Sequence, residues 1–432
     1  MNRTRLFGAL LTLALVAPFV GHVGANGPTS SVLFEWNQIL QDSFPTQGVG
    51  TFRPFSMTHI AMFDAINAIE RDYEPYFAQP RPSDGGSPEA AAAQAAHDVL
   101  VGLNPTQTAV YDAALARQIG TRPSGHVRRG AAVGARVAQE ILAWRQNDGW
   151  VVTPTPAYSE PPLPGRWQPT PPARAAAAFT HLQFAAPMAL LTATQFLPPP
   201  PPSLTSTRYA TDLNEIKAIG KSDSSIRTAE QTVTARVWNG VAASGTGTAT
   251  NFLSVWNNIV RDVVQERHLS LVAAARVFVL VNVSMQDSLM TTQASKFVYG
   301  LWRPVTAIQQ ADTDLNAATD ADPGWMPLLV TPPYPSYAGN MATIGAGAAR
   351  ALQLVFRTDD IPVTVTWKQS GGQPDVTHQF SGFWEVAEEQ SNSRMWGGIH
   401  YRFDQEAGQN IAKSVAEYAF NNYVQRRSRF WD

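Results

Sequence analysis

The chain has 432 residues, of which 44% are hydrophobic and 15% are charged, with a formal net charge of −2 and no cysteine. This composition indicates a folded globular protein, and the near-balance of charge gives little support to nucleic-acid binding. The lack of cysteine excludes disulfides, cysteine nucleophiles, and zinc or iron–sulfur sites built on cysteine.

The first 25 residues (1–25) have the features of a secretory signal peptide. Arg3 and Arg5 precede a short apolar run over residues 6–20, and the small residues of Val23-Gly24-Ala25 suit a cleavage site. A membrane anchor is the alternative, but the run is shorter than the ~20 residues that a span needs. We expect cleavage near Ala25, a secreted or periplasmic protein, and no membrane span in the mature chain.

The remaining chain divides into two helical halves, residues 26–149 and 204–432, joined by a proline-rich segment, residues 150–203. Proline at this density excludes long helices, and the interleaved aromatic residues favour an ordered loop that wraps around the helices. Apolar spacing predicts an all-α fold of packed helical bundles. The expected helices cover residues 32–40, 55–69, 88–103, 105–119, 127–145, 207–220, 226–238, 249–266, 270–289, 342–356, 383–391 and 404–423, and the best strand candidate is 363–367.

Residues 296–304 read KFVYGLWRP and form a candidate binding segment. Lys296 and Arg303 are seven residues apart, so a helix of two turns would place both on one face. Pro304 disfavours helix at Arg303, so we expect the helix to end near it and the guanidinium to turn inward. Two cations among aromatic residues can hold a tetrahedral oxyanion, although a solvated basic pair on a surface helix is the alternative.

Residues 334–347 read YPSYAGNMATIGAG, which predicts an extended approach, a turn at Ala338-Gly339-Asn340 and a helix of small residues. The first N–H groups of a helix lack partners and attract anions. A catalytic site usually has a proton-carrying side chain at such a turn, whereas Met341 carries no proton. This loop alone fits an active site, a damaged one or ordinary packing.

Residues 393–404 read SRMWGGIHYRFD. Arg394 and His400 are six residues apart and would lie on different faces of a continuous helix, but the break at Gly397-Gly398 allows them to converge. Asp404 follows His400 by one turn, where a carboxylate can orient the ring through its second nitrogen. A structural histidine is the alternative.

Taken together, these three segments resemble the vanadium-dependent haloperoxidase and type-2 phosphatidic acid phosphatase superfamily. The resemblance is closest to the soluble bacterial haloperoxidase-like members, and it is specific over residues 280–420. It implies an all-α fold with helical bundles around one oxyanion site. The matching motifs are Lys296-x6-Arg303-Pro304, Pro335-Ser336-Tyr337 and Ser393-Arg394-x5-His400-x3-Asp404.

The resemblance also implies a role for each matching residue. Lys296, Arg303 and Arg394 would hold the oxygens of vanadate or phosphate, because cations neutralise the charge on such groups. His400 would be the covalent ligand, bound to vanadium in the peroxidases and to phosphorus in the phosphatases. Asp287 would be the family's acid that pairs with Arg394.

The turn departs from the family pattern. Where the family has Ser-Gly-His, this chain has Gly339, Asn340 and Met341, so the general acid–base histidine is missing. We expect the N–H groups of these three residues to bind the oxyanion without moving protons. Gln293 and Tyr334 also stand where haloperoxidases have aromatic or basic groups near the halide. Loss of positioned proton transfer should slow catalysis by about 10²–10⁴-fold.

Three functions stay open from the sequence. The first is a vanadium haloperoxidase-type oxidoreductase acting on peroxide and halide, with another group in place of the missing histidine. The second is an acid phosphatase that attacks phosphate esters through His400, and the third is a catalytically impaired relative that binds the oxyanion. The sequence does not fix the oligomeric state. Candidates for the replacement group are His59, His181, His268 and His378.

Overall fold

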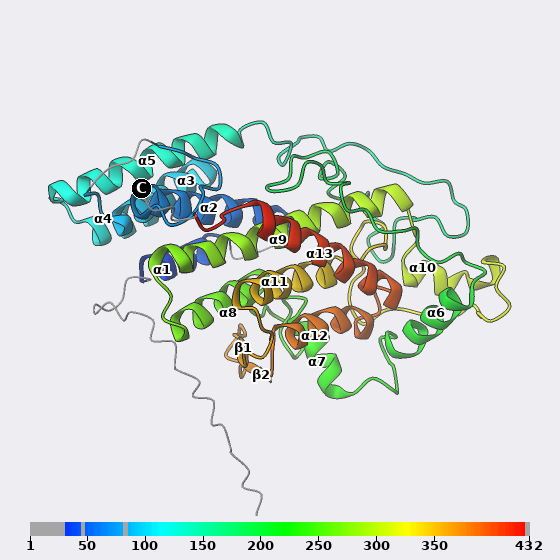
Figure 1. The fold of residues 1–432 in the computed structure, drawn as a ribbon. Coiled ribbons are helices and arrows are strands. Elements are labelled where there is room, and N and C mark those ends of the chain that lie inside the picture. The colour runs from blue at the N-terminus through cyan, green and yellow to red at the C-terminus, as the bar shows by residue number, and fades with distance from the viewer. Residues whose placement is uncertain (1–30, 45–47, 81–84, 428–432) are drawn as a thin grey trace, which may run out of the picture.

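The computed structural model describes residues 31–44, 48–80 and 85–427 (Figure 1). The expected signal peptide lies outside these residues. As predicted, the fold is all-α apart from one two-stranded sheet. The elements are α1 (Ser31–Ser43), η1 (Val49–Thr51), α2 (Phe52–Glu70), α3 (Pro88–Leu103), η2 (Pro105–Gln107), α4 (Thr108–Ile119), α5 (Gly125–Trp144), α6 (Thr207–Ile219), α7 (Ala229–Val237), α8 (Phe252–Glu266), α9 (Leu271–Tyr299), α10 (Pro304–Gln309), η3 (Ala311–Thr313), α11 (Asn340–Phe356), β1 (Val363–Trp367), β2 (Val376–Phe380), α12 (Phe383–Trp396) and α13 (Arg402–Asn422).

The longest helix, α9, runs through the middle of the molecule, with α2, α11 and α13 packed along it (Figure 1). It is buried around its circumference, which is typical of a helix enclosed by other helices. Among the described residues, α9 is also long and apolar enough to cross a membrane. The sequence predicted no membrane span in the mature chain. However, 89% of the relevant window is buried inside the protein, as in a core helix.

Helix α9 ends at Tyr299, not at residue 289. Gly300 forms its C-cap with a φ of 60°, a left-handed conformation that glycine adopts without strain, and its N–H donates to the carbonyl of Lys296. The predicted basic helix through Lys296 and Arg303 is therefore wrong. Arg303 lies beyond the end of α9, in extended conformation at the N-cap of α10, with Pro304 as the first residue of that helix.

In the N-terminal half, α3 and α5 approach closely through small residues. A Cβ atom added at Gly130 would lie 2.2 Å from the carbonyl oxygen of Ser87, and one at Gly134 would lie 2.2 Å from that of Ala91. No side chain fits at either position, so the two glycines set the separation of the helices.

The described residues between α5 and α6 hold no helix and pass over the core helices (Figure 1). Asp287, in the middle of α9, accepts hydrogen bonds from the three consecutive N–H groups of residues 188–190, at 2.7, 2.6 and 2.9 Å. Farther back in the segment, the N–H of Ala178 donates to the carbonyl of Pro333 at 2.9 Å. The segment is thereby tied both to the central helix and to the loop that precedes α11.

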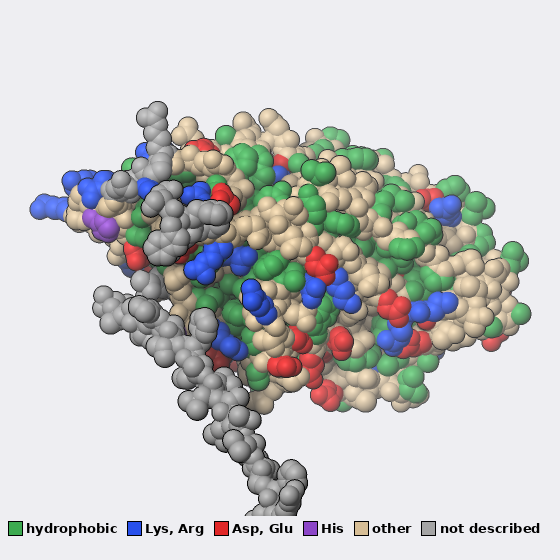
Figure 2. Space-filling model, in the orientation of Figure 1, with side chains coloured by type: hydrophobic (Ala, Val, Ile, Leu, Met, Phe, Trp, Pro, Cys, Tyr) green, Lys and Arg blue, Asp and Glu red, His purple; other side chains and the backbone are tan. Residues whose placement is uncertain are grey.

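The sheet is an antiparallel pair whose register runs from Val363↔Phe380 to Trp367↔Val376. Strand β1 has the predicted bounds. Strand β2 and helix α10 were not predicted, because β2 has polar residues at its centre and α10 is too short to show a helical period. On the face shown in Figure 2, Lys and Arg side chains alternate with Asp and Glu, without a continuous field of one sign.

Candidate oxyanion site

Three cationic side chains are buried, one from the last turns of α9, one from the N-cap of α10 and one from α12. Lys296 and Arg303 have no exposed surface, and Arg394, in the last turn of α12, is 4% exposed. Both of the first two lie over the ring of Tyr334, with Lys296 Nζ 5.4 Å and Arg303 Cζ 5.0 Å from its centroid. The two cations therefore converge as expected, although they do so across a chain turn and not along one helix.

The site holds excess positive charge. Burial lowers the pKa of Lys296 well below its ordinary value and that of Arg394 to about 10, and the neighbouring charge of Arg303 adds to both effects. The carboxylate of Asp404 opposes the lowering at Lys296 and at Arg303. Three buried cations facing one carboxylate are costly without a further anion.

Two of the cations also have donors without an acceptor. Arg303 donates through Nε to the carbonyl of Tyr334 and through Nη1 to that of Ile399, both at 2.8 Å, while Nη2 is buried with no partner. Arg394 donates through Nη2 to Asn239 Oδ1 at 2.7 Å, while Nε and Nη1 are buried with no partner. Buried donors are nearly always satisfied in proteins, so these nitrogens indicate a place for a bound anion.

Lys296 joins α9 to the turn before α11. Its Nζ donates to the carbonyl of Ser336 at 2.7 Å and to that of Ala338. In the preceding residue, the hydroxyl of Ser295 donates to the carbonyl of Tyr337 at 3.3 Å. An ammonium has three donors, so Lys296 can hold the turn and still offer one N–H to a ligand.

The tautomer of His400 follows from its two neighbours. Nδ1 lies 2.8 Å from Asp404 Oδ2, as predicted, and Nε2 lies 3.1 Å from Arg303 Nη1. Because a guanidinium nitrogen only donates, Nε2 must accept and Nδ1 must carry the proton. Burial, together with Arg303, Lys296 and Arg394, lowers the pKa of His400 well below its ordinary value. The ring is therefore neutral, with the Nε2 lone pair facing the cations.

Asp404 holds the histidine in that orientation. Besides His400, its Oδ2 accepts from the hydroxyl of Ser336 at 2.6 Å and from the N–H of Tyr401 at 3.2 Å. Burial raises the pKa of Asp404 to about 6, and the hydrogen bond from Ser336 and the charge of Lys296 act in the opposite direction. Its fixed position, in the first turn of α13, orients the imidazole through Nδ1.

The turn supplies fewer donors than expected. The N–H of Gly339 donates to the carbonyl of Asp404 at 2.8 Å, so the expectation that it binds the oxyanion is wrong. Asn340 and Met341 begin α11, and N–H groups in the first turn of a helix have no partner within it. The sulfur of Met341 lies 3.8 Å from Gln390 Nε2, which shows that its side chain packs toward α12.

The expected pairing of Asp287 with Arg394 is also wrong. Arg394 instead donates a hydrogen bond to Asn239, which follows α7. No local pattern in the sequence predicts a contact between two residues so far apart in the chain. The carboxylate of Asp287 is fully engaged by the N–H groups of residues 188–190. Its place in the fold is structural, because it anchors the proline-rich segment.

Gln293 lies three residues before Lys296 in α9. It is fully buried, and neither its amide oxygen nor its amide nitrogen has a hydrogen-bond partner among the described residues. Each of the four histidines considered as replacements for the missing histidine lies by other residues. His59 approaches Asn37 at 3.3 Å and stacks on Phe278, and His181 approaches the carbonyl of Trp150 at 3.0 Å. His268 lies just after α8, and His378 approaches Glu389 at 2.9 Å.

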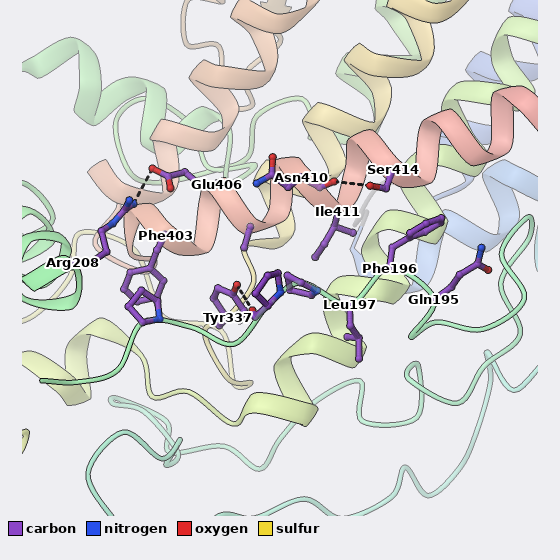
Figure 3. Close-up of a pocket in the computed structure, with 14 residues that line it drawn as sticks. Gln195, Phe196, Leu197, Arg208, Tyr337, Phe403, Glu406, Asn410, Ile411 and Ser414 are labelled. Carbon is purple, nitrogen blue, oxygen red and sulfur yellow. Dashed lines mark hydrogen bonds and ion pairs between the residues drawn. The ribbon is translucent and has the colours of Figure 1, made fainter. Parts of the chain in front are cut away.

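A groove with a volume of about 510 Å³ lies behind the turn, between α13 and residues 195–202 (Figure 3). Tyr337 and Phe403 line it, and the hydroxyl of Tyr337 donates to the carbonyl of Pro199 at 2.7 Å. Ser336, one residue earlier, points to Asp404. Successive side chains of the turn thus face opposite ways, one toward the cationic site and the next toward the groove.

Comparison with known proteins gives the context of this geometry. Residues 276–428 match the family described as the VCPO second helical-bundle domain. This stretch contains Lys296, Arg303, Arg394 and His400. A vanadium chloroperoxidase from Curvularia inaequalis is 23% identical over 180 residues, which cover 32% of this chain and 29% of that protein. The chain therefore spans less than a third of the length of this relative.

Solved structures share the fold over nearly the whole chain. A bacterial vanadium-dependent iodoperoxidase superposes with a TM-score of 0.77 at 23% identity, covering 94% of this chain and 99% of the other. A bacterial vanadium-dependent chloroperoxidase in its holo form superposes with a TM-score of 0.69 at 16% identity, covering 87% and 92%. At these identities the likeness concerns the fold, and the chemistry must be argued from the residues of this chain.

Proposed function

We propose, from the premise that the chain belongs to the vanadium-dependent haloperoxidase and type-2 phosphatidic acid phosphatase superfamily, that its buried cationic site binds vanadate and supports peroxide-dependent oxidation of halide. The observation that carries the proposal is the set of guanidinium nitrogens on Arg303 and Arg394 that are buried without an acceptor, in a site where the lone pair of His400 faces the cations. Phosphate, which has the same shape and charge pattern, is the alternative oxyanion.

The residues present fit a tetrahedral oxyanion. Arg303 and Arg394 offer planar N–H groups to its oxygens, and Lys296 offers a point charge. The N–H groups of Asn340 and Met341, at the start of α11, add two backbone donors and the favourable end of a helix dipole. Such an anion would satisfy the free donors and offset the excess positive charge.

His400 is the residue suited to bond the central atom. Its Nε2 is unprotonated, and its Nδ1 proton is held by Asp404, the arrangement by which proteins orient histidine ligands. Bound vanadate would supply a Lewis-acidic centre that activates hydrogen peroxide. The chain itself neutralises the charge on the oxygens, fixes the ligand nitrogen and encloses the site.

Proton movement is the part of the chemistry that the turn does not provide. The side chain of Met341 carries no proton and packs toward Gln390. General acid–base catalysis typically contributes about 10²–10⁴-fold, so we expect turnover slower by about that factor than in a site with a histidine at the turn. Anion affinity should persist, because none of the three cations depends on Met341.

The experiment compares the wild-type chain with His400→Ala, and with His126→Ala as a control on an exposed histidine of α5. Equilibrium dialysis with vanadate should show one site in the wild type and the control, and an affinity at least tenfold lower in His400→Ala. Bromination or iodination of a phenol dye, with vanadate and peroxide present, should disappear in His400→Ala only.

Three outcomes separate the functions. Halogenation by the wild type supports the proposal. Hydrolysis of p-nitrophenyl phosphate in the absence of vanadate, lost in His400→Ala, would assign the site to phosphoryl transfer instead. Vanadate binding with neither activity would identify a catalytically impaired oxyanion-binding relative. Full retention of vanadate binding and activity in His400→Ala would show that the site is elsewhere.

A further inference from the structure

We propose that the hydroxyl of Tyr334 carries the proton at this site, in the role for which the turn has only Met341. The inference rests on the proposed function, since it presupposes an oxyanion bound at His400. It adds a residue that sequence reasoning placed only near the halide position, and it gives that residue a chemical step.

The position of Tyr334 is fixed by the cations themselves. Its ring lies over Lys296 Nζ and Arg303 Cζ, at 5.4 and 5.0 Å from the centroid. Its carbonyl accepts from Arg303 Nε at 2.8 Å. Aromatic faces attract cations, so these contacts stabilise one placement of the ring beside the two residues that would hold the oxyanion.

The hydroxyl of Tyr334 contacts Asn340, at the start of α11. Asn340 Nδ2 lies 3.4 Å from the Tyr334 oxygen and donates to it, so the phenol accepts there and its own proton stays available. Burial lowers the pKa of Arg303 and of Arg394, and the phenol oxygen of Tyr334 opposes that lowering in both.

The other hydroxyl protons near the turn are already donated. The partners are Asp404 for Ser336, the carbonyl of Pro199 for Tyr337, the carbonyl of Pro198 for Tyr299, and the carbonyl of Gly339 for Thr343. None of these protons can move to a ligand without breaking an existing hydrogen bond. Tyr334 is the hydroxyl beside the cations for which the described residues show no acceptor.

The proton step balances without a further reagent. If an oxygen left the bound oxyanion, the O–H bond of Tyr334 would break and its proton would bond to the departing oxygen. The charges of Lys296, Arg303 and Arg394 would stabilise the phenolate that remains. A water molecule that replaced the lost oxygen would return a proton to the phenolate. Tyr334 thus acts as an acid in one half of the exchange and as a base in the other.

The test compares Tyr334→Phe, which removes only the hydroxyl, with Tyr337→Phe as a matched control. Tyr337 lies on the same turn, but its hydroxyl faces the groove behind it (Figure 3). Stopped-flow mixing would measure the rates of vanadate association and dissociation, and equilibrium dialysis the affinity. A proton carrier changes the rates of ligand exchange and not its equilibrium. We therefore expect Tyr334→Phe to slow both rates by about 10²-fold with unchanged affinity, and Tyr337→Phe to change neither.

The outcomes distinguish this inference from the function on which it rests. If the wild type does not bind vanadate, the proposed function fails. If it binds and both rates are unchanged in Tyr334→Phe, only the role of Tyr334 is overturned. A loss of affinity with an unchanged association rate would reduce Tyr334 to a binding contact and also overturn the proposal. Recovery of the exchange rates in the double variant Tyr334→Phe, Met341→His would support it, by restoring a proton carrier at the turn.

Discussion

At the scale of single residues, the chemistry of the site depends on which nitrogen of His400 carries no proton. Arg303 on one side and Asp404 on the other assign the proton to Nδ1 and leave the Nε2 lone pair facing the cations. The sequence shows a histidine and a carboxylate four residues apart, and this spacing predicts their contact. The hydrogen bond from Arg303 to the other nitrogen depends on the tertiary structure, because Arg303 lies 97 residues away in the chain.

A substitution at Asp404 tests this assignment. Asp404→Asn preserves the shape and can still accept from Nδ1, but it lacks the charge that raises the basicity of the ring. We expect the affinity for vanadate to fall by about 10–100-fold. Asp375→Asn, at a carboxylate whose partner is the exposed Lys368, serves as the control. Equal affinities in both variants and the wild type, measured by equilibrium dialysis, would mean that the carboxylate does not support the ligand.

At the scale of elements, buried carboxylates fasten irregular segments to helices. Asp287 in α9 accepts three consecutive N–H groups from residues 188–190, and Asp64 in α2 accepts the three of residues 76–78. Each supplies hydrogen bonds to backbone that forms no helix or sheet ladder there. The sequence shows the acid and the irregular segment separately, and only packing brings them together.

Asp287→Asn should loosen the proline-rich segment. An amide has one oxygen and two donors, so it cannot accept all three N–H groups. We expect the free energy of unfolding to fall by about 2 kcal/mol, and amide exchange at residues 188–190 to accelerate. Asp262→Asn, at a half-exposed carboxylate of α8, is the control. Unchanged exchange at residues 188–190 would contradict the anchoring role.

The same variant should change the dependence of stability on pH. Burial raises the pKa of Asp287 from 3.8 to about 6, against the effect of its N–H donors. Between these values the folded chain retains a proton that the unfolded chain has released, so this group's contribution to stability is lost as pH rises through that window. Denaturation measured from pH 4 to 7 should show a steeper loss of stability in the wild type than in Asp287→Asn, in which Asp64, Glu70 and Asp404 still titrate in this window.

At the scale of the whole molecule, the long helix α9 carries both a residue that anchors a loop and a residue of the cationic site. Its buried middle carries Asp287, which holds the proline-rich segment, and its last turn carries Lys296, which holds the turn before α11. The proposed anion site lies inside the fold, so binding there should stabilise the folded state as a whole. Such stabilisation follows from ligand binding to the folded and not the unfolded chain.

Vanadate should therefore raise the melting temperature of the wild-type protein. At a concentration 100 times the dissociation constant, the expected gain in the free energy of unfolding is about 2.7 kcal/mol. Thermal denaturation followed by circular dichroism, with and without vanadate, measures the shift. His126→Ala should respond as the wild type does, and His400→Ala should respond much less. An equal shift in His400→Ala would indicate binding away from this site.

The sequence by itself determined the helical architecture and the order along the chain of the segments that carry Lys296, Met341 and His400, because helical periodicity, breakers and residue types are local properties. It also placed Asp404 beside His400, one turn away. Only the tertiary structure decided the partners of Asp287, Arg394 and Gly339, and the central place of Tyr334 among the cations. These depend on contacts between distant segments, which packing of the helices selects and which no local spacing encodes.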